Sequence, residues 1–202
     1  MGKELTGIGR RRGFGCAAYF LAFLALALLG AGCGASGNGA VTDSEKAADV
    51  EILNSLLARE LAVVHAYTLG LAQLRGPMRA VADELHTQSQ AHVDAITKAI
   101  RGLGGASDAE ADEIESPPPK SRNDALTLAY EEENAALAEA LEASPRLASQ
   151  APTTLAAALV ASHAQHLVVL RQGLGSGLAA SVPGAFETGG EPPPGTPPGE
   201  QG

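Results

Sequence analysis

Apolar residues recur at steps of three and four along four long segments of the chain, and this spacing constrains the fold more than any other feature. On an α-helix such residues share one face, so each segment predicts an amphipathic helix that must bury its apolar side. Ala and Leu dominate the apolar residues, aromatic residues make up only 3% of the chain, and Trp is absent. Because an aliphatic composition of this kind suits helices better than sheets, we expect an all-α fold.

Capping and turn residues delimit the first two predicted helices. Thr42 and Glu45 have the spacing of a capping box, which begins a helix over about residues 43–74. A Gly-Pro pair then breaks the chain, because proline is best accommodated in the first turn of the following helix. That second helix is expected to run to about Arg101 and to end at the glycine-rich run 102–105.

A long connection and two further helices follow. Residues 106–120 are acidic, end in three prolines and a lysine, and lack periodicity, so they predict a loop. Ser121 and Asp124 form a weaker capping pattern, which begins a third helix that reaches about Ala143. After a short connection between two prolines, the fourth helix is expected over about residues 153–173.

Two helix pairs joined by a long connection predict a four-helix bundle over residues 43–174. The connection between the second and third helices is long enough to cross the length of the bundle. An up-down-up-down bundle with one loose loop is the alternative topology. Beyond the bundle, residues 175–202 are rich in Gly and Pro, which predicts a disordered tail.

Acidic or imidazole side chains interrupt each predicted apolar stripe near its middle. In an antiparallel bundle the midpoints of the helices meet at one level, so these side chains are expected to converge in the core. A lone buried carboxylate is costly unless it is paired or bound to a metal. The interrupting residues, one or two on each helix, are Glu60, His92, Glu133, His163 and His166.

Carboxylate oxygens and imidazole nitrogens together suit Fe, Mn, Zn or Cu, so the cluster predicts a metal ion in the core. Each residue also has a simpler interpretation. Glu60 can be hydrogen-bonded to Tyr130 or to a histidine, and Glu133 belongs to an acidic run that a one-residue shift in register would expose. His92 can be a core histidine with satisfied hydrogen bonds. The His163/His166 pair can simply bond the two glutamates.

The first 32 residues have the features of an export signal. Three arginines at 10–12 precede a 14-residue apolar stretch, which is short for a membrane span of about 20 residues. Small residues at 30–32 then lead to Cys33, which resembles a bacterial lipobox, although the usual Leu three residues before the cysteine is Gly30 here. We therefore expect a lipoprotein signal peptide over residues 1–32 and lipidation of Cys33. An uncleaved N-terminal anchor is the alternative.

The export route stays open between the general pathway and the twin-arginine pathway, because Arg11, Arg12 and Phe14 also resemble the R-R-x-F pattern. Either route places the domain outside the cytoplasm. The lipid at Cys33 would hold it on the outer face of the cytoplasmic membrane, or on the periplasmic side, with residues 33–42 as a flexible spacer.

Composition excludes several classes of function. The formal net charge is -9, and removal of residues 1–32 leaves 10 Lys and Arg against 22 Asp and Glu, which argues against nucleic-acid binding. The only cysteines are Cys16 and Cys33, so the bundle itself holds no disulfide and no thiolate metal site. No nucleophile motif or phosphate-binding glycine loop is present, because the glycines at 102–105 form a helix stop. Bundles of this kind can form homodimers, but no exposed apolar stripe marks an interface.

Two stretches resemble the bacterial ferritin-like domain family, whose members are often exported: DVEILNSLLARELAVVHAYTLGLAQL (49–74) and QSQAHVDAI (88–96). The resemblance spans about residues 43–174 and implies a ferritin-like four-helix bundle with a long crossover between helices two and three. In that superfamily each half of the bundle supplies a Glu from one helix and a Glu-x-x-His motif from the next. The residues that match these four positions are Glu60, His92, Glu133 and His166.

Two departures separate this sequence from the di-iron pattern. Ser89 stands where the Glu before His92 is expected, and His163 stands where the Glu before His166 is expected. In the di-iron pattern these two carboxylates are metal ligands, usually bridging. We therefore expect a single metal ion, held by some of the five residues, rather than ferroxidase chemistry. The alternative is a non-enzymatic envelope scaffold with a degenerate site.

Overall fold

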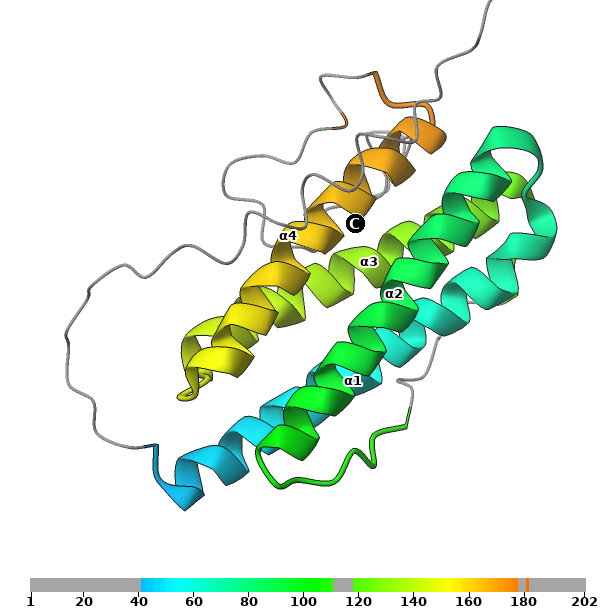
Figure 1. Cartoon of the computed structure of the whole chain (residues 1–202). Helices are drawn as coiled ribbons and strands as arrows, with labels where there is room; N and C mark the ends of the chain where they lie inside the picture. The colour runs from blue at the N-terminus through cyan, green and yellow to red at the C-terminus, as the bar shows by residue number, and fades with distance from the viewer. Residues whose placement is uncertain (1–40, 111–117, 178–180, 182–202) are drawn as a thin grey trace, which may run out of the picture. The chain divides into compact units, whose positions relative to one another are not determined.

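The computed structural model describes residues 41–110, 118–177 and 181. These residues belong to one compact unit of the chain. The expected signal peptide, the expected lipidation site Cys33 and nearly all of the expected spacer and tail lie outside the described residues. Within them the structure is all-helical, as the sequence predicts, and it contains four long α-helices (Figure 1). The helices are α1 (Asp43–Gly70), α2 (Gly76–Gly102), α3 (Arg122–Ala143) and α4 (Gln150–Gly173).

The capping patterns of the sequence are formed in the structure. The hydroxyl of Thr42 accepts a hydrogen bond from the backbone N–H of Glu45 at 3.2 Å, and the Glu45 carboxylate accepts one from the backbone N–H of Thr42 at 2.7 Å. At the start of α3, the Ser121 hydroxyl accepts from the backbone N–H of Asp124 at 3.1 Å. Each cap satisfies amide groups that the first helical turn leaves without partners.

Two helix boundaries differ from the sequence-based expectation. The α-helical part of the first helix ends at Gly70, and a 3₁₀ turn, Leu71–Gln73, completes it. Tightening of this kind is common in the last turn of a helix. The fourth helix begins at Gln150, three residues earlier than expected, because Pro152 lies inside its first turn, where its missing N–H costs no hydrogen bond.

One end of the bundle contains the start of α1 and the end of α2. Asn54 of α1 donates a side-chain hydrogen bond at 3.1 Å to the carbonyl of Ala106, just beyond α2. The turn between α3 and α4 lies at the same end, because the buried carboxylate of Asp49 accepts hydrogen bonds from the backbone N–H groups of Ala148 and Ser149, at 2.8 and 2.9 Å.

The opposite end of the bundle contains the start of α3. Gly70, at the end of α1, lies against Ala125, and Arg122 donates a hydrogen bond at 2.8 Å to the carbonyl of Gly173 at the end of α4. The chain therefore leaves α2 at one end and enters α3 at the other, so residues 103–121 connect the two ends. The long crossover is confirmed, and the up-down-up-down alternative is wrong. In this arrangement α1 packs on α2 and α3, and α4 packs on α3 and α2, which leaves α1 and α4 diagonal to each other.

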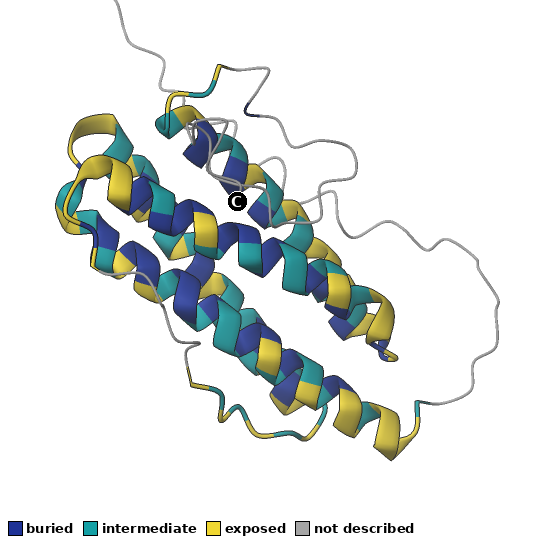
Figure 2. Ribbon diagram, turned by 180° about the vertical axis from the view of Figure 1, so that it is seen from behind, coloured by how far each residue is buried: buried dark blue, intermediate teal, exposed yellow. Residues whose placement is uncertain are grey.

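Apolar side chains fill the bundle on both sides of its middle. Buried residues alternate with exposed ones along all four helices (Figure 2). One core cluster lies toward the α1–α2 turn and includes Val63, Leu85 and Leu167. A second cluster lies toward the other end and includes Leu57, Ile96 and Leu159. On α1, α2 and α4 the acidic and imidazole residues fall between these two clusters.

We expect Asp49→Ala to destabilise the bundle, because it leaves the N–H groups of Ala148 and Ser149 without their shared acceptor. Asp49 is only 1% exposed, so the loss should lower the free energy of unfolding by about 2–4 kcal/mol. Urea denaturation followed by circular dichroism measures this. Glu51→Ala, on the exposed side of the same helix, is the matched control and should change the value by less than about 0.5 kcal/mol. Equal effects of the two substitutions would contradict this role of Asp49.

Candidate metal centre

The five side chains that interrupt the stripes come together in the middle of the bundle. Four of them are almost completely inaccessible, with exposed fractions of 2% for Glu60, 0% for Glu133, 0% for His163 and 2% for His166. His92 lies at the margin and is half-buried. The expected convergence is therefore present, with one acid from each of α1 and α3, one imidazole from α2 and two from α4.

His163 lies at the centre of the cluster and joins the two carboxylates. Its Nε2 lies 2.7 Å from Oε1 of Glu60, and its Nδ1 lies 2.7 Å from Oε2 of Glu133. An imidazole that donates from both nitrogens carries both protons and is a cation. Burial alone would lower the pKa of His163, but the hydrogen bonds to Glu133 and Glu60 outweigh it and raise the pKa to about 10.

Glu133 is the most heavily bonded acid of the cluster. Its Oε1 accepts from Nδ1 of His166 at 2.9 Å and from the hydroxyl of Tyr67 at 2.8 Å, in addition to the bond from His163. Burial by itself would raise the pKa of Glu133, but the neighbouring His166 and His163 outweigh it and hold the pKa far below its usual range. Burial and the Glu133 charge raise the pKa of Tyr67 well above 10, so its hydroxyl stays a donor.

Glu60 is ionised for a similar reason. Burial would raise its pKa, but hydrogen bonds from His163 and from Nδ1 of His92, at 3.4 Å, lower it below the usual value. The alternative in which Tyr130 bonds Glu60 is wrong. The Tyr130 hydroxyl instead accepts hydrogen bonds from the buried guanidinium of Arg171, the shorter at 3.0 Å. The alternative in which a histidine bonds Glu60 is confirmed.

The polar residues around His166 complete the cluster. Its Nε2 lies 2.9 Å from Oε1 of Gln88 and 3.3 Å from the hydroxyl of Ser162. Ser89, at the position of a family glutamate, is fully buried and donates to the carbonyl of Leu85 at 3.1 Å, so its hydroxyl turns back to its own helix. The contacts of Tyr67 with Glu133 and of Gln88 with His166 were not predicted from the sequence. The signal for Tyr67 was its place on the stripe of Glu60, two turns away.

The donor set suits one metal ion and does not suit two. Two groups of three side chains could each hold an ion, Glu60–His92–His163 and Glu133–His163–His166. Within each group the three potential ligand atoms lie within 4.8 Å of one another, and His163 belongs to both groups. Carboxylate and imidazole donors match Fe, Mn, Zn or Cu. Two carboxylates balance the charge of one divalent ion, whereas two divalent ions would leave two positive charges uncompensated in a buried site, which is costly.

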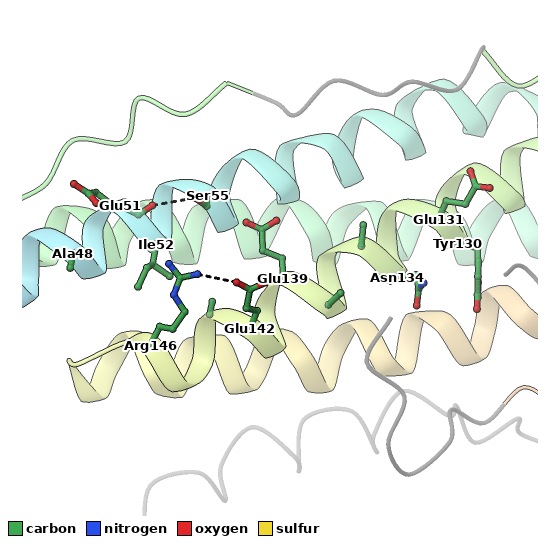
Figure 3. A pocket seen from close by; sticks show the side chains of 13 residues that line it. Ala48, Glu51, Ile52, Ser55, Tyr130, Glu131, Asn134, Glu139, Glu142 and Arg146 are labelled. Carbon is green, nitrogen blue, oxygen red and sulfur yellow. Dashed lines mark hydrogen bonds and ion pairs between the residues drawn. The ribbon is translucent and has the colours of Figure 1, made fainter. Parts of the chain in front are cut away.

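A surface groove of about 860 Å³ lies on the outer side of α1 and α3, away from this cluster (Figure 3). Its lining mixes alanines and acidic side chains with larger residues such as Ile52, Tyr130 and Arg146, and none of the five cluster residues contributes to it. Glu142 is already bonded to Arg146 at 3.3 Å. This groove is therefore separate from the candidate metal centre.

Comparison with known proteins identifies the family and supports the fold. The family described as "Ferritin-like domain" matches residues 48–176. A conserved hypothetical protein from Mycobacterium tuberculosis has a similar solved structure, with a TM-score of 0.60 and 19% identity over 66% of this chain and 94% of that one. No curated protein sequence matches the chain.

Two other similar solved structures are those of proteins described as having metal sites. One is a ferritin-like diiron-carboxylate protein from Bacillus anthracis, with a TM-score of 0.55 and 20% identity over 64% of this chain and 97% of that one. The other is the bacterioferritin of Rhodobacter capsulatus, with a metal-free dinuclear site and heme iron, at a TM-score of 0.53 and 22% identity over 63% of this chain and 84% of that one. At these identities the likeness concerns the fold alone.

We expect the metal-free protein to be most stable between about pH 4.5 and pH 6.5. The raised pKa of His163 gives stability that is complete below its unfolded pKa and is lost as the pH rises toward about 10. The lowered pKa values of Glu60 and Glu133 give stability that is complete above their unfolded values and is lost in acid. Melting temperatures measured from pH 3 to pH 10 with a chelator present test this.

His163→Gln is the informative variant for this pH profile, because glutamine cannot titrate. It should remove the alkaline decline in melting temperature, whereas His65→Gln, at an exposed position on α1, should keep it. A wild-type melting temperature that stays flat from pH 6.5 to pH 9.5 would contradict the charged state assigned to His163.

Proposed function

The chain belongs to the ferritin-like domain family, and we propose that within this fold it binds a single transition-metal ion through its core Glu and His side chains. The observation that carries the proposal is the layer of two carboxylates and three imidazoles, which forms two groups of three, each with its potential ligand atoms within 4.8 Å of one another. The ions that suit these donors are Fe, Mn, Zn and Cu. Which of them is bound depends on supply as well as on the donor set.

A complete di-iron centre is not proposed. The Bacillus anthracis neighbour is described as a diiron-carboxylate protein and the Rhodobacter capsulatus one has a dinuclear site. Di-iron sites of the superfamily use a Glu-x-x-His motif on two helices. Here Ser89 and His163 replace both motif glutamates. Ser89 turns to a backbone carbonyl, and His163 brings positive charge where the motif brings negative charge.

We further propose that the protein is exported and anchored to the membrane by a lipid on Cys33. This proposal is supported by the sequence alone, through the arginines at 10–12, the short apolar stretch and the small residues before the cysteine. A metal-binding lipoprotein outside the cytoplasm would meet metal ions as they enter the cell envelope. The anchor would keep the bundle near the membrane surface.

A second candidate function is a structural envelope module in which the cluster holds no metal. One observation favours it: His163 and Glu133 satisfy their hydrogen bonds and charges within the protein, so the core has no need of an ion to be stable. This candidate predicts that chelators leave the melting temperature unchanged.

We expect the purified full-length chain to hold about one Fe, Mn, Zn or Cu ion after supplementation with these metals. The measurement is elemental analysis by mass spectrometry after removal of loosely bound ions. The His163→Ala/His166→Ala variant should lose the ion, because it removes two imidazoles from the buried layer. His65→Ala is the matched control and should keep full occupancy, since His65 is exposed. Wild-type occupancy below about a tenth of an ion per chain would exclude the metal-binding proposal.

Cys33→Ser should abolish lipid attachment and release the protein from the membrane fraction, because the thiol is the group that carries the lipid. Labelling of the bacterial host with radioactive palmitate, followed by fractionation, measures both effects. Cys16→Ser is the matched control, since Cys16 lies within the apolar part of the signal and should not affect labelling. Membrane retention of Cys33→Ser without any label in the wild type would instead support an uncleaved anchor.

A further inference from the structure

The two candidate ligand groups compete for His163. The imidazole has two ring nitrogens, and each already faces a different carboxylate, Glu60 at Nε2 and Glu133 at Nδ1. A metal-binding histidine uses one nitrogen for the ion, and its other N–H is usually held by an acceptor that fixes the ring. With one ion present, one of these carboxylates is therefore a ligand and the other becomes the acceptor that orients His163.

The group Glu133–His163–His166 has an orienting acceptor for each histidine. Both rings direct Nδ1 at Glu133, with distances of 2.7 and 2.9 Å to its two oxygens. Both rings direct Nε2 out of the group, His163 to Glu60 at 2.7 Å and His166 to Gln88 at 2.9 Å. Each imidazole is thus already turned so that one nitrogen is held and the other can be given to an ion.

The group Glu60–His92–His163 is less well supported. His92 approaches Glu60 only to 3.4 Å, and its side chain is 16% exposed whereas the other four are at most 3% exposed. Among the described residues, no acceptor fixes its Nε2. His92 also lies on α2, whereas both imidazoles of the other group lie one turn apart on α4. A site built on Glu60 and His92 would therefore have one ring free to move.

We infer that Glu133, His163 and His166 are the ligands of the ion, and that Glu60 and Gln88 are positioning residues that orient the two histidines. The inference rests on the proposed function and makes it specific. It assigns a ligand set of two imidazoles and one carboxylate, which is typical of mononuclear Zn²⁺ and non-heme Fe²⁺ sites. It also removes His92 and Glu60, which match the family motif, from direct contact with the ion. Tyr67 supports the ligand Glu133 through its hydroxyl.

Two matched pairs of variants test this assignment with Co²⁺ as the probe. The full-length chain is titrated in detergent, with visible absorption for affinity and coordination and elemental analysis for stoichiometry. His166→Gln and Glu133→Gln should weaken Co²⁺ binding by more than about a hundredfold, because each removes a ligand. Their partners, His92→Gln and Glu60→Gln, should keep one ion per chain. His92→Gln should leave the affinity within about threefold of the wild type.

The positioning residues have their own signature. Glu60→Gln and Gln88→Ala should weaken Co²⁺ binding about 10–100-fold and shift the absorption bands, while saturation still gives one ion per chain. Gln88→Glu keeps an acceptor for His166 that Gln88→Ala lacks. Its Co²⁺ affinity and absorption bands should therefore be closer to those of the wild type than those of Gln88→Ala. Circular dichroism and melting of each metal-free variant show whether it is folded. For a ligand variant that is unfolded, His166→Asn or Glu133→Asn takes its place, because each also removes the ligand.

The outcomes separate this inference from the proposal on which it depends. If wild-type protein binds no Co²⁺, Fe²⁺, Mn²⁺, Zn²⁺ or Cu²⁺, the metal-binding function itself is wrong. If the wild type binds Co²⁺ but His92→Gln loses it as fully as His166→Gln does, the metal-binding function stands and the ligand assignment is overturned. Retention of Co²⁺ by His166→Gln or Glu133→Gln at wild-type affinity overturns the assignment as well.

Discussion

The contact on which the rest of the structure depends is the pair of 2.7 Å hydrogen bonds that His163 makes to Glu60 and Glu133. Two ionised carboxylates in an apolar core are tolerable only when each has a close partner, since breaking a buried ion pair costs several kcal/mol. The imidazolium of His163 serves both acids at once. Because it extends from α4 to α1, its diagonal neighbour, it fixes the register of helices that otherwise share little direct contact.

The crossover between α2 and α3 sets the direction of the helices around this contact. It places the start of α3 at the end of the bundle opposite to the end of α2, so α3 runs antiparallel to both α1 and α4, on which it packs. Apolar clusters lie on both sides of the level at which His163 meets the two carboxylates. A histidine between two carboxylates would be weakly held in water, but in the dry core each hydrogen bond is stronger, and an unpaired group would be correspondingly expensive.

The helices and most of the cluster could be predicted from the sequence, because burying an apolar helix face is strongly favourable and burying an acid without a partner is costly. Glu60 and Glu133 stand out on apolar stripes, since a buried acid demands a partner. Which atoms pair is decided by side-chain rotamers and small rotations of each helix, and periodicity does not resolve these. For that reason the sequence could not show that Tyr67 bonds Glu133, or that Tyr130 turns to Arg171 instead. The early start of α4 does not follow from the sequence pattern, because a proline can either stand in a connection or lie in the first turn of a helix, as Pro152 does.

The replacement of one motif glutamate by His163 changes what a metal ion must displace. A four-carboxylate core without metal holds several negative charges that repel one another, so metal binding relieves strain between like charges. In this protein the same position supplies a cation. The pKa of His163 near 10 means that the protonated ring already balances part of the carboxylate charge, as a metal ion would. A metal ion therefore competes with that proton for one nitrogen, and its binding must release the proton to the solvent. The affinity for metal should accordingly rise with pH across the neutral range, while the metal-free bundle remains folded. A site of this kind can take up and release an ion without unfolding, because in both states every charge in its core has a partner.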